Sequence, residues 1–282
     1  MAAVLVLAGG SVAASELLRT QARLARRTIG KDLGEEAHSA DRTHKKKYGN
    51  PIELLVLGDS IAAGLGAEKP RHTLGAQLAK RLAKHTRRTV RVHTAAMVGA
   101  ETSMLRAQLA GLPTGYRPDV AVIVVGGNDV THRVRLSESV SHLAQAVAAL
   151  REHGCEVVVG TCPDLSALTS VPQPLRALGG RSSRRLARAQ RTVVTDMGAR
   201  AVSLAHVVGP FFLAQPDAMF AIDRFHPSGA GYRRTAKALL PSVLAAIGQD
   251  ATLPFGHFGP TNPGLIGEQT SVEDDPPSPE LG

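Results

Sequence analysis

"LLVLGDSIAAG", residues 54–64, contains the transition that decides the fold. Four apolar residues run directly into Gly58, Asp59 and Ser60, and small residues follow as far as Gly64. A short apolar run bounded by turn residues is typical of a buried strand, while Asp and Ser favour the start of a helix. The stretch therefore predicts a strand, a sharp turn and a helix. Ser60 is then either a nucleophile exposed at the turn or the cap of that helix.

Strand-like and helix-like segments alternate through the middle of the chain. The strand-like segments are short apolar runs at residues 52–57, 89–96, 119–127, 155–161 and 201–205. The helix-like segments have apolar residues at helical spacing and lie at residues 74–86, 100–111, 137–154, 181–200 and 232–248. This alternation predicts an α/β fold, a three-layer α/β/α sandwich with helices on both faces of a parallel sheet.

Polar and glycine residues follow four of the predicted strands. In open parallel sheets, ligands bind outside the carboxyl ends of the strands. The segments at those ends are residues 58–60, 96–99, 126–129 and 161–163. We expect these four segments to meet at one edge of the sheet, so the search for chemistry narrows to that edge.

The segment "VVGGNDV", residues 124–130, ends the strongest predicted strand. Its two glycines let the backbone approach a ligand closely, and Asn128 supplies a neutral amide donor of the kind that stabilises an oxyanion. Gly-Asn-Asp is also ordinary turn chemistry, so this segment taken alone is equally consistent with a plain turn.

The segment "IDRFHP", residues 222–227, supplies a base. Asp223 and His226 lie three residues apart in a loop that precedes the last predicted helix. A carboxylate in that position can hold one imidazole nitrogen and leave the other free to deprotonate a hydroxyl. Any single histidine is more often structural, but this one has an adjacent aspartate on a fold that also presents Ser60 and Asn128.

In chain order, "GDSIAAG" (58–64), "MVGAETS" (97–103), "GGND" (126–129) and "DRFHP" (223–227) resemble the sequence blocks of the SGNH hydrolases, also called the GDSL esterase/lipase family. The resemblance covers about residues 51–248. It implies a flavodoxin-like sandwich, a Ser60 nucleophile, His226 as general base, Asp223 to orient it, and neither a metal nor a cofactor. The oxyanion hole implied is the N–H of Ser60, the N–H of Gly99 and the amide of Asn128. The second block departs from the family pattern, which often has an asparagine ahead of this glycine.

The function predicted is a serine esterase or lipase that cleaves carboxylic esters of short- to medium-chain acids through an acyl-enzyme. Alternatives within the family are a carbohydrate deacetylase, a lysophospholipase or a thioesterase. A different class of protein, a catalytically silent relative that binds carbohydrate or lipid, would not need to keep Ser60, Asn128, Asp223 and His226. A nucleotide-binding module would need a phosphate loop, which the acidic turn at residues 58–64 does not provide. The Pro-interrupted connection at residues 164–183 is expected to form a wall or lid of the pocket.

Composition limits the partners. Of 282 residues, 43% are hydrophobic and only 3% aromatic, which suits a core of Val, Leu, Ala and Ile. The net charge of +9 arises from arginines scattered over predicted helices without interleaved aromatics, so nucleic-acid binding is not expected. The same charge favours association of the basic N-terminal region with an anionic membrane surface. Cys155 and Cys162 flank a predicted strand and are expected to be free thiols about 20 Å apart.

Three regions divide the chain in the predicted organisation. Residues 1–50 comprise an apolar segment, which resembles the remnant of a signal or anchor, and a charged lead-in. Residues 51–250 form the hydrolase domain, and residues 251–282 are expected to be a Pro-rich disordered tail. A secreted or cell-envelope location is favoured over a cytoplasmic one, and the sequence leaves the oligomeric state open.

Overall fold

Strand β2 (Ile52–Gly58) lies near the centre of a seven-stranded sheet in the computed structural model, which describes residues 16–24, 33–34 and 36–261. The strand order is β1-β3-β2-β4-β5-β6-β7. The other strands are β1 (Thr43–His44), β3 (Val90–Thr94), β4 (Val120–Val124), β5 (Glu156–Gly160), β6 (Arg200–Val202) and β7 (His257–Phe258). Strands β2 to β6 are all parallel, and β1 and β7 pair antiparallel at the two edges.

The order of the parallel strands produces a switch point beside β2. The chain passes from β2 to β3 on one side and then to β4, β5 and β6 on the other. A crevice forms outside the carboxyl ends of the strands where the winding reverses, here between β2 and β4. The end of β2 leads into Ser60, and the end of β4 leads into Asn128.

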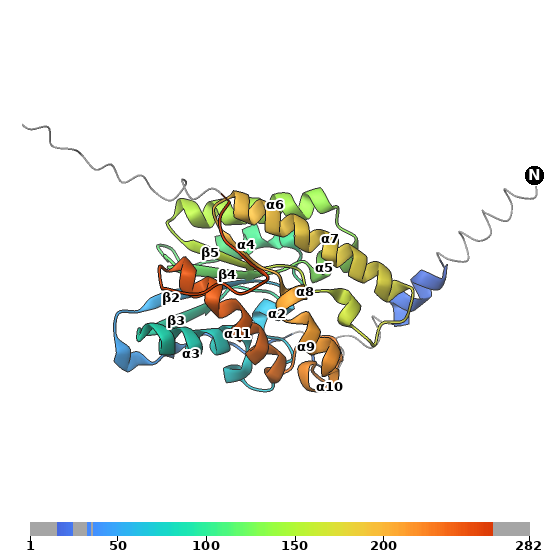
Figure 1. Ribbon diagram of the computed structural model, residues 1–282, viewed down its shortest axis with the longest axis horizontal. Coiled ribbons are helices and arrows are strands. Elements are labelled where there is room, and N and C mark those ends of the chain that lie inside the picture. The colour runs from blue at the N-terminus through green and yellow to red at the C-terminus, as the bar shows by residue number, and fades with distance from the viewer. Residues whose placement is uncertain (1–15, 25–32, 35, 262–282) are drawn as a thin grey trace, which may run out of the picture.

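Two layers of helices cover the sheet (Figure 1). One face is covered by α3 (Leu74–Thr86) and α11 (Gly229–Ala246), and the other by α4 (Leu105–Ala110), α6 (Leu136–Glu152) and α7 (Leu175–Asp196). Side chains of β2 alternate between the two cores, as the pleat of a strand requires: Leu54 and Val56 face one, Leu55 and Leu57 the other. The prediction of a three-layer α/β/α sandwich is confirmed.

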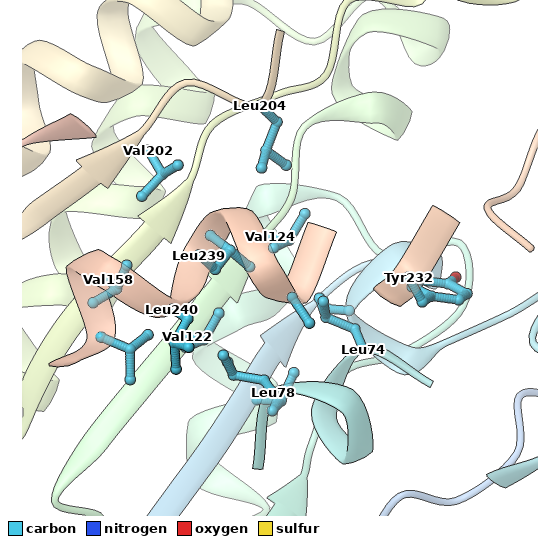
Figure 2. Close-up of a cluster of buried hydrophobic side chains, with 14 of the residues drawn as sticks. Leu74, Leu78, Val122, Val124, Val158, Val202, Leu204, Tyr232, Leu239 and Leu240 are labelled. Carbon is cyan, nitrogen blue, oxygen red and sulfur yellow. The ribbon is translucent and has the colours of Figure 1, made fainter. Parts of the chain in front are cut away.

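The core on the α3 and α11 side underlies the candidate site (Figure 2). Its side chains come from strands and helices alike, and the figure labels Leu74, Leu78, Val122, Val124, Val158, Val202, Leu204, Tyr232, Leu239 and Leu240. The buried Tyr232 hydroxyl donates to the Leu65 carbonyl at 2.5 Å, which ties the start of α11 to the segment after α2 (Ser60–Ala63). Figure 1 also shows α5 (Gly127–His132), α8 (Leu204–Val207), α9 (Gly209–Ala214) and α10 (Pro216–Met219) at the carboxyl edge of the sheet.

Several predicted boundaries need correction. Helix α7 begins at Leu175 rather than at residue 181, so the last nine residues of the expected 164–183 connection are helical. The expected tail from residue 251 is wrong for its first part, because His257 and Phe258 pair with β6. The lead-in contributes edge strand β1 and a helical segment at residues 16–24. The predicted signal or anchor at residues 1–15 and the tail at 262–282 lie outside the described residues.

Both cysteines are buried free thiols, as predicted. No helix in the described ranges combines the length and the hydropathy needed to cross a bilayer.

Candidate active site

Ser60 is the first residue of α2, not the cap of that helix. Asp59 is the cap, and its Oδ1 accepts from the Ile61 N–H at 2.9 Å. The turn is possible because Gly58 has a φ of +130° and lies against β4, where a Cβ would come within 1.9 Å of the Val124 carbonyl oxygen. The Asp59 N–H donates to the same oxygen at 3.0 Å. Ser60 is thereby held at the carboxyl edge, next to the end of β4.

The Ser60 hydroxyl meets an imidazole from the far end of the chain. Its Oγ lies 2.9 Å from Nε2 of His226, although the two residues are 166 positions apart. On the other side of the ring, Nδ1 lies 2.6 Å from Oδ2 of Asp223. All three side chains are buried. The predicted residues Ser60, His226 and Asp223 are therefore in a single hydrogen-bonded row, which can pass a proton from the hydroxyl to the imidazole.

The carboxylate of Asp223 is held so that it can stabilise a positive charge on His226. Its Oδ1 accepts from the backbone N–H groups of Phe225 (3.1 Å) and His226 (3.0 Å). Burial acts to raise the pKa of Asp223, but the hydrogen bond and charge of His226, with these two N–H groups, hold that pKa below its ordinary value. Asp223 thus remains ionised and fixes which ring nitrogen carries the proton.

The loop that carries the pair is fastened at both of its ends. The Ala221 N–H donates to the His226 carbonyl at 2.7 Å, which closes the loop on itself. Ser228 caps α11 by accepting from its second and third N–H groups and donates to the Ala218 carbonyl at 2.6 Å. Oε1 of Glu68 accepts from the first N–H of α11, that of Gly229, at 3.1 Å. These bonds leave the imidazole little freedom to move away from Ser60.

Asn128 lies at the end of β4 and lines the same cavity as Ser60. The chain reaches it through Gly126, whose φ of +129° is one that L side chains rarely adopt. One hydrogen of the Asn128 amide is used in a 2.9 Å bond to the Ala100 carbonyl, and the amide has a second hydrogen to offer. The geometry is compatible with an oxyanion donor that is oriented by the loop after β3.

Gly99 lies in that loop, one residue before Ala100. The Ala100 N–H donates to the Met97 carbonyl at 3.2 Å, which makes a turn with Gly99 at φ +80°. Gly99 is exposed and does not belong to the lining of the cavity around Ser60. The structure therefore brings Asn128 and Ser60 together, while the place of Gly99 in the oxyanion hole stays a prediction.

Two buried glutamines, which sequence reasoning missed, hold the strand ends in place. Gln108 of α4 makes a reciprocal pair with Gly58, donating to its carbonyl at 2.8 Å and accepting from its N–H at 2.9 Å. Gln190 of α7 donates to the Val125 carbonyl and accepts from the Cys162 N–H. Because buried backbone groups without partners are costly, these side chains stabilise the irregular turns at the ends of β2, β4 and β5.

Two further buried carboxylates lie beneath the site. Burial raises the pKa of Asp59 to about 6, and the neighbouring Asp129 acts in the same direction, opposed by hydrogen bonds from Ile61 and Gly127 and by the charge of His226. Asp129 accepts from the Thr102 N–H at 3.0 Å and from the Ser139 hydroxyl at 2.6 Å. Asp129 therefore links the loop after β3 to α6.

An apolar cavity of about 80 Å³ opens beside Ser60. Its apolar lining comes from the segment after β5 and from the region between β6 and α11, namely Ile61, Pro163, Leu165, Ala167, Leu168, Leu204, Val208, Phe212, Phe220, Phe225 and Pro227. The rings of Phe212 and Phe220 meet edge to face with centroids 4.8 Å apart. The first residues of the predicted 164–183 wall thus do line the cavity.

The aromatic residues of this cavity were not predicted. Phe212, Phe220 and Phe225 lie between the last parallel strand and α11, a region to which the sequence assigned only the catalytic loop. A signal was available: four of the six phenylalanines of the chain fall within residues 211–225. In the parts of the chain that the structure describes, no three His, Cys, Asp or Glu side chains gather into a metal-binding group.

Comparisons with known proteins show which family the chain resembles. Residues 56–234 match the model of the GDSL-like Lipase/Acylhydrolase family. The chain is 40% identical over 214 residues to the GDSL-like esterase Rv1075c of Mycobacterium tuberculosis (strain ATCC 25618 / H37Rv), covering 76% of this chain and 68% of that one.

Solved structures resemble the fold. A lipase/acylhydrolase from Enterococcus faecalis has a TM-score of 0.55 and 18% identity, over 71% of this chain and all (100%) of that one. Axe2, an acetylxylan esterase from Geobacillus stearothermophilus, has a TM-score of 0.53 and 21% identity, over 72% of this chain and 97% of that one. At these identities the likeness concerns the fold alone.

Proposed function

This chain belongs to the GDSL-like lipase/acylhydrolase family, the SGNH hydrolases, and is a hydrolase acting on esters; we propose that it is a serine esterase with Ser60 as nucleophile. The observation that carries the proposal is the row of hydrogen bonds from Ser60 Oγ to His226 (2.9 Å) and from His226 to Asp223 (2.6 Å). The complete row favours an active enzyme over a silent binding relative, which would have no need of it.

In the proposed reaction, Ser60 Oγ attacks the ester carbonyl carbon while His226 Nε2 accepts the hydroxyl proton. Asp223 stabilises the imidazolium through Nδ1. The carbonyl oxygen becomes an oxyanion, for which we propose the Ser60 N–H, the second hydrogen of the Asn128 amide and the Gly99 N–H as donors. His226 then protonates the departing alcohol oxygen, and the acyl group remains on Ser60.

Water completes the cycle by the same steps. His226 removes a proton from a water molecule, which attacks the acyl carbon, and the proton returns to Ser60 Oγ as the acid departs. Because Ser60 is the first residue of α2, its N–H has no intrahelical acceptor and can point at the oxyanion in both halves of the reaction.

The acyl group is proposed to occupy the apolar cavity. Its lining is apolar and aromatic, with Phe212 and Phe220 packed against each other, which suits a hydrocarbon chain better than a sugar ring. The cavity is small, so we propose esters of short- to medium-chain acids as substrates. Axe2 acts on acetylated xylan by its name, but the apolar lining here favours esters of longer acids over a carbohydrate deacetylase.

The test is hydrolysis of p-nitrophenyl esters from acetate to palmitate by the purified wild type, Ser60→Ala and Ser141→Ala. Ser141 is exposed on α6 and serves as the matched control. We expect rates to be highest for the butyrate to octanoate esters, to fall by about 10⁴-fold or more in Ser60→Ala, and to be unchanged in Ser141→Ala. Undiminished turnover in Ser60→Ala would refute the nucleophile. A folded wild type that hydrolyses none of these esters would instead favour a deacetylase or a silent relative.

A further inference from the structure

Seven large hydrophobic side chains are exposed in the described part of the chain, and several of them lie in segments at the carboxyl edge of the sheet. These residues are Leu17, Leu24, Met97, Leu178, Leu213, Ile222 and Phe255. Met97 follows β3, Leu213 follows β6 in α9, and Ile222 precedes Asp223. Single exposed apolar residues are common, but a group of them near the edge that holds the cavity is not explained by folding.

The helical segment at residues 16–24 extends this edge. Gln21 is buried there and joins it to the wall of the cavity: its Nε2 donates to the Gln173 carbonyl at 2.5 Å, and its Oε1 accepts from the Leu175 N–H at 3.2 Å. Leu17 lies one turn before Gln21, and its side chain is 50% exposed. Figure 1 shows this segment beside the start of α7, at the end of the molecule where α9 and α10 also lie.

Helix α7 begins beside this segment and has many more basic than acidic residues. It contains six arginines, and its one acidic residue, Asp196, is its last residue. Exposed Leu178 is followed at spacings of three and seven residues by Arg181 and Arg185, which places all three on one face of the helix. Neither arginine has an ion-pair partner among the described residues.

We propose that Leu17, Leu178, Arg181 and Arg185 form a docking face for an anionic lipid surface. Apolar side chains that enter the interface beside arginines that meet lipid phosphates are the combination by which proteins bind such surfaces without spanning them. Exposed Leu213 follows Phe212 of the cavity lining, and exposed Ile222 lies in the loop that carries Asp223, so docking would hold the mouth of the cavity toward lipid. That orientation matters to catalysis only if the proposed function holds, whereas the docking does not depend on it.

The test measures co-flotation of the full chain with vesicles of phosphatidylcholine alone or mixed with phosphatidylglycerol. The variants are Arg181→Glu/Arg185→Glu, Leu17→Ser/Leu178→Ser, and Lys46→Glu/Lys47→Glu as the control of equal charge change. Lys46 and Lys47 are exposed just before β2, at the opposite edge of the sheet. Thermal unfolding of each variant verifies folding without reference to activity.

We expect the wild type to float with the anionic vesicles and far less with phosphatidylcholine alone. The arginine double variant should bind at least about tenfold more weakly, while the lysine control stays within about twofold of the wild type. The leucine double variant should also lose binding, because the apolar contact is removed. Equal losses of binding in the arginine and lysine variants would mean that only the net charge of the protein matters, and this would overturn the proposed docking face. So would a wild type that does not bind, or binding that survives both docking-face variants and is lost only on removal of residues 1–15.

Discussion

The carboxyl and amino edges of the sheet are built from the same five parallel strands, yet they differ in whether their charged side chains are buried or exposed. At the carboxyl edge, Asp59, Asp129 and Asp223 are almost completely buried. At the amino edge, Glu53 of β2 instead forms a 2.6 Å ion pair with Arg91 of β3, in which the arginine is 55% exposed. Because the same strands end at both edges, the difference originates in the segments that connect them.

The burial of carboxylates at the carboxyl edge lowers the stability of the fold there. A buried carboxylate is unfavourable unless hydrogen bonds and charges compensate it. At the carboxyl edge His226 provides most of that compensation for Asp223, and the Ile61 N–H provides the largest share for Asp59. Asp223 is compensated so well that its pKa falls, whereas the pKa of Asp59 remains raised to about 6. Substitutions at the two edges should therefore differ greatly in their effects.

The largest effect in this comparison is expected for Asp223→Asn. An amide preserves the size of the side chain but favours the wrong tautomer of His226 and cannot stabilise the imidazolium. We expect kcat to fall by about 10⁴-fold, with KM little changed. The measurement is steady-state hydrolysis of p-nitrophenyl butyrate.

Asp217→Asn is the matched control, since Asp217 is exposed in the same region and pairs with Arg224 at the surface. An Asp223→Asn enzyme that retains most of its kcat would remove Asp223 from the proposed mechanism.

The next effect concerns the oxyanion. Asn128→Ala removes one amide donor and also leaves the Ala100 carbonyl without its partner. We expect a loss of about 10²–10³-fold in kcat. The exposed amide of Gln145 in α6 provides the control, Gln145→Ala, which should leave kcat unchanged. If Asn128→Ala raised KM and left kcat intact, the amide would bind the ground state and not the oxyanion.

A third effect is on stability and has opposite signs for two aspartates. Burial raises the pKa of Asp59 from 3.8 to about 6, so between these values the folded protein holds a proton that the unfolded chain has released. The contribution of Asp59 to the free energy of unfolding is therefore largest below pH 4 and falls by roughly 3 kcal/mol as the pH rises through 6. For Asp223, whose pKa is lowered, the contribution is present above pH 4 and is lost as the pH falls through the folded pKa.

Urea unfolding of the wild type, Asp59→Asn and Asp223→Asn between pH 3 and 8 measures both contributions. The free energy of the wild type minus that of Asp59→Asn should fall with rising pH, and the corresponding difference for Asp223→Asn should rise. Two slopes of the same sign would contradict the assignment of opposite environments to the two carboxylates.

The parts of the fold that sequence predicts best are those with strong local signals. Residues 74–86 were predicted as a helix, and α3 has those bounds because Thr73 caps it and its apolar face is regular. The start of α7 was missed because residues 164–183 were interpreted as a connection interrupted by prolines, whereas Gly179 and Gly180 of that stretch are helical. Gly180 is buried against Ser166, where a Cβ would come within 2.6 Å of the Ser166 Cβ, so it is required by packing and not by a turn. Sequence alone does not separate these two reasons for a glycine.

The residues of the site also differ in how well the sequence predicts them. Ser60, Asn128, Asp223 and His226 could be named because each lies at a strand end or in a short motif. Their supports could not, since Gln108 and Gln190 act through contacts with residues 28 to 65 positions away. The edge strands β1 and β7 have two residues each, too few to show any periodicity, so they depend entirely on tertiary pairing.

The smallest effect is expected at the amino edge, for Glu53→Gln. The side chain of Glu53 accepts from Arg91 on the neighbouring strand. Because Arg91 is exposed, solvent screens the ion pair, and the arginine side chain loses conformational entropy when the pair forms. We expect the free energy of unfolding to fall by no more than about 1 kcal/mol, with less effect at high salt, and kcat to be unchanged. Urea unfolding at low and high salt measures the first, and ester hydrolysis the second. A loss of several kcal/mol, or of activity, would mean that the two edges are coupled through β2, and the contrast between a costly functional edge and an inexpensive structural one would not hold.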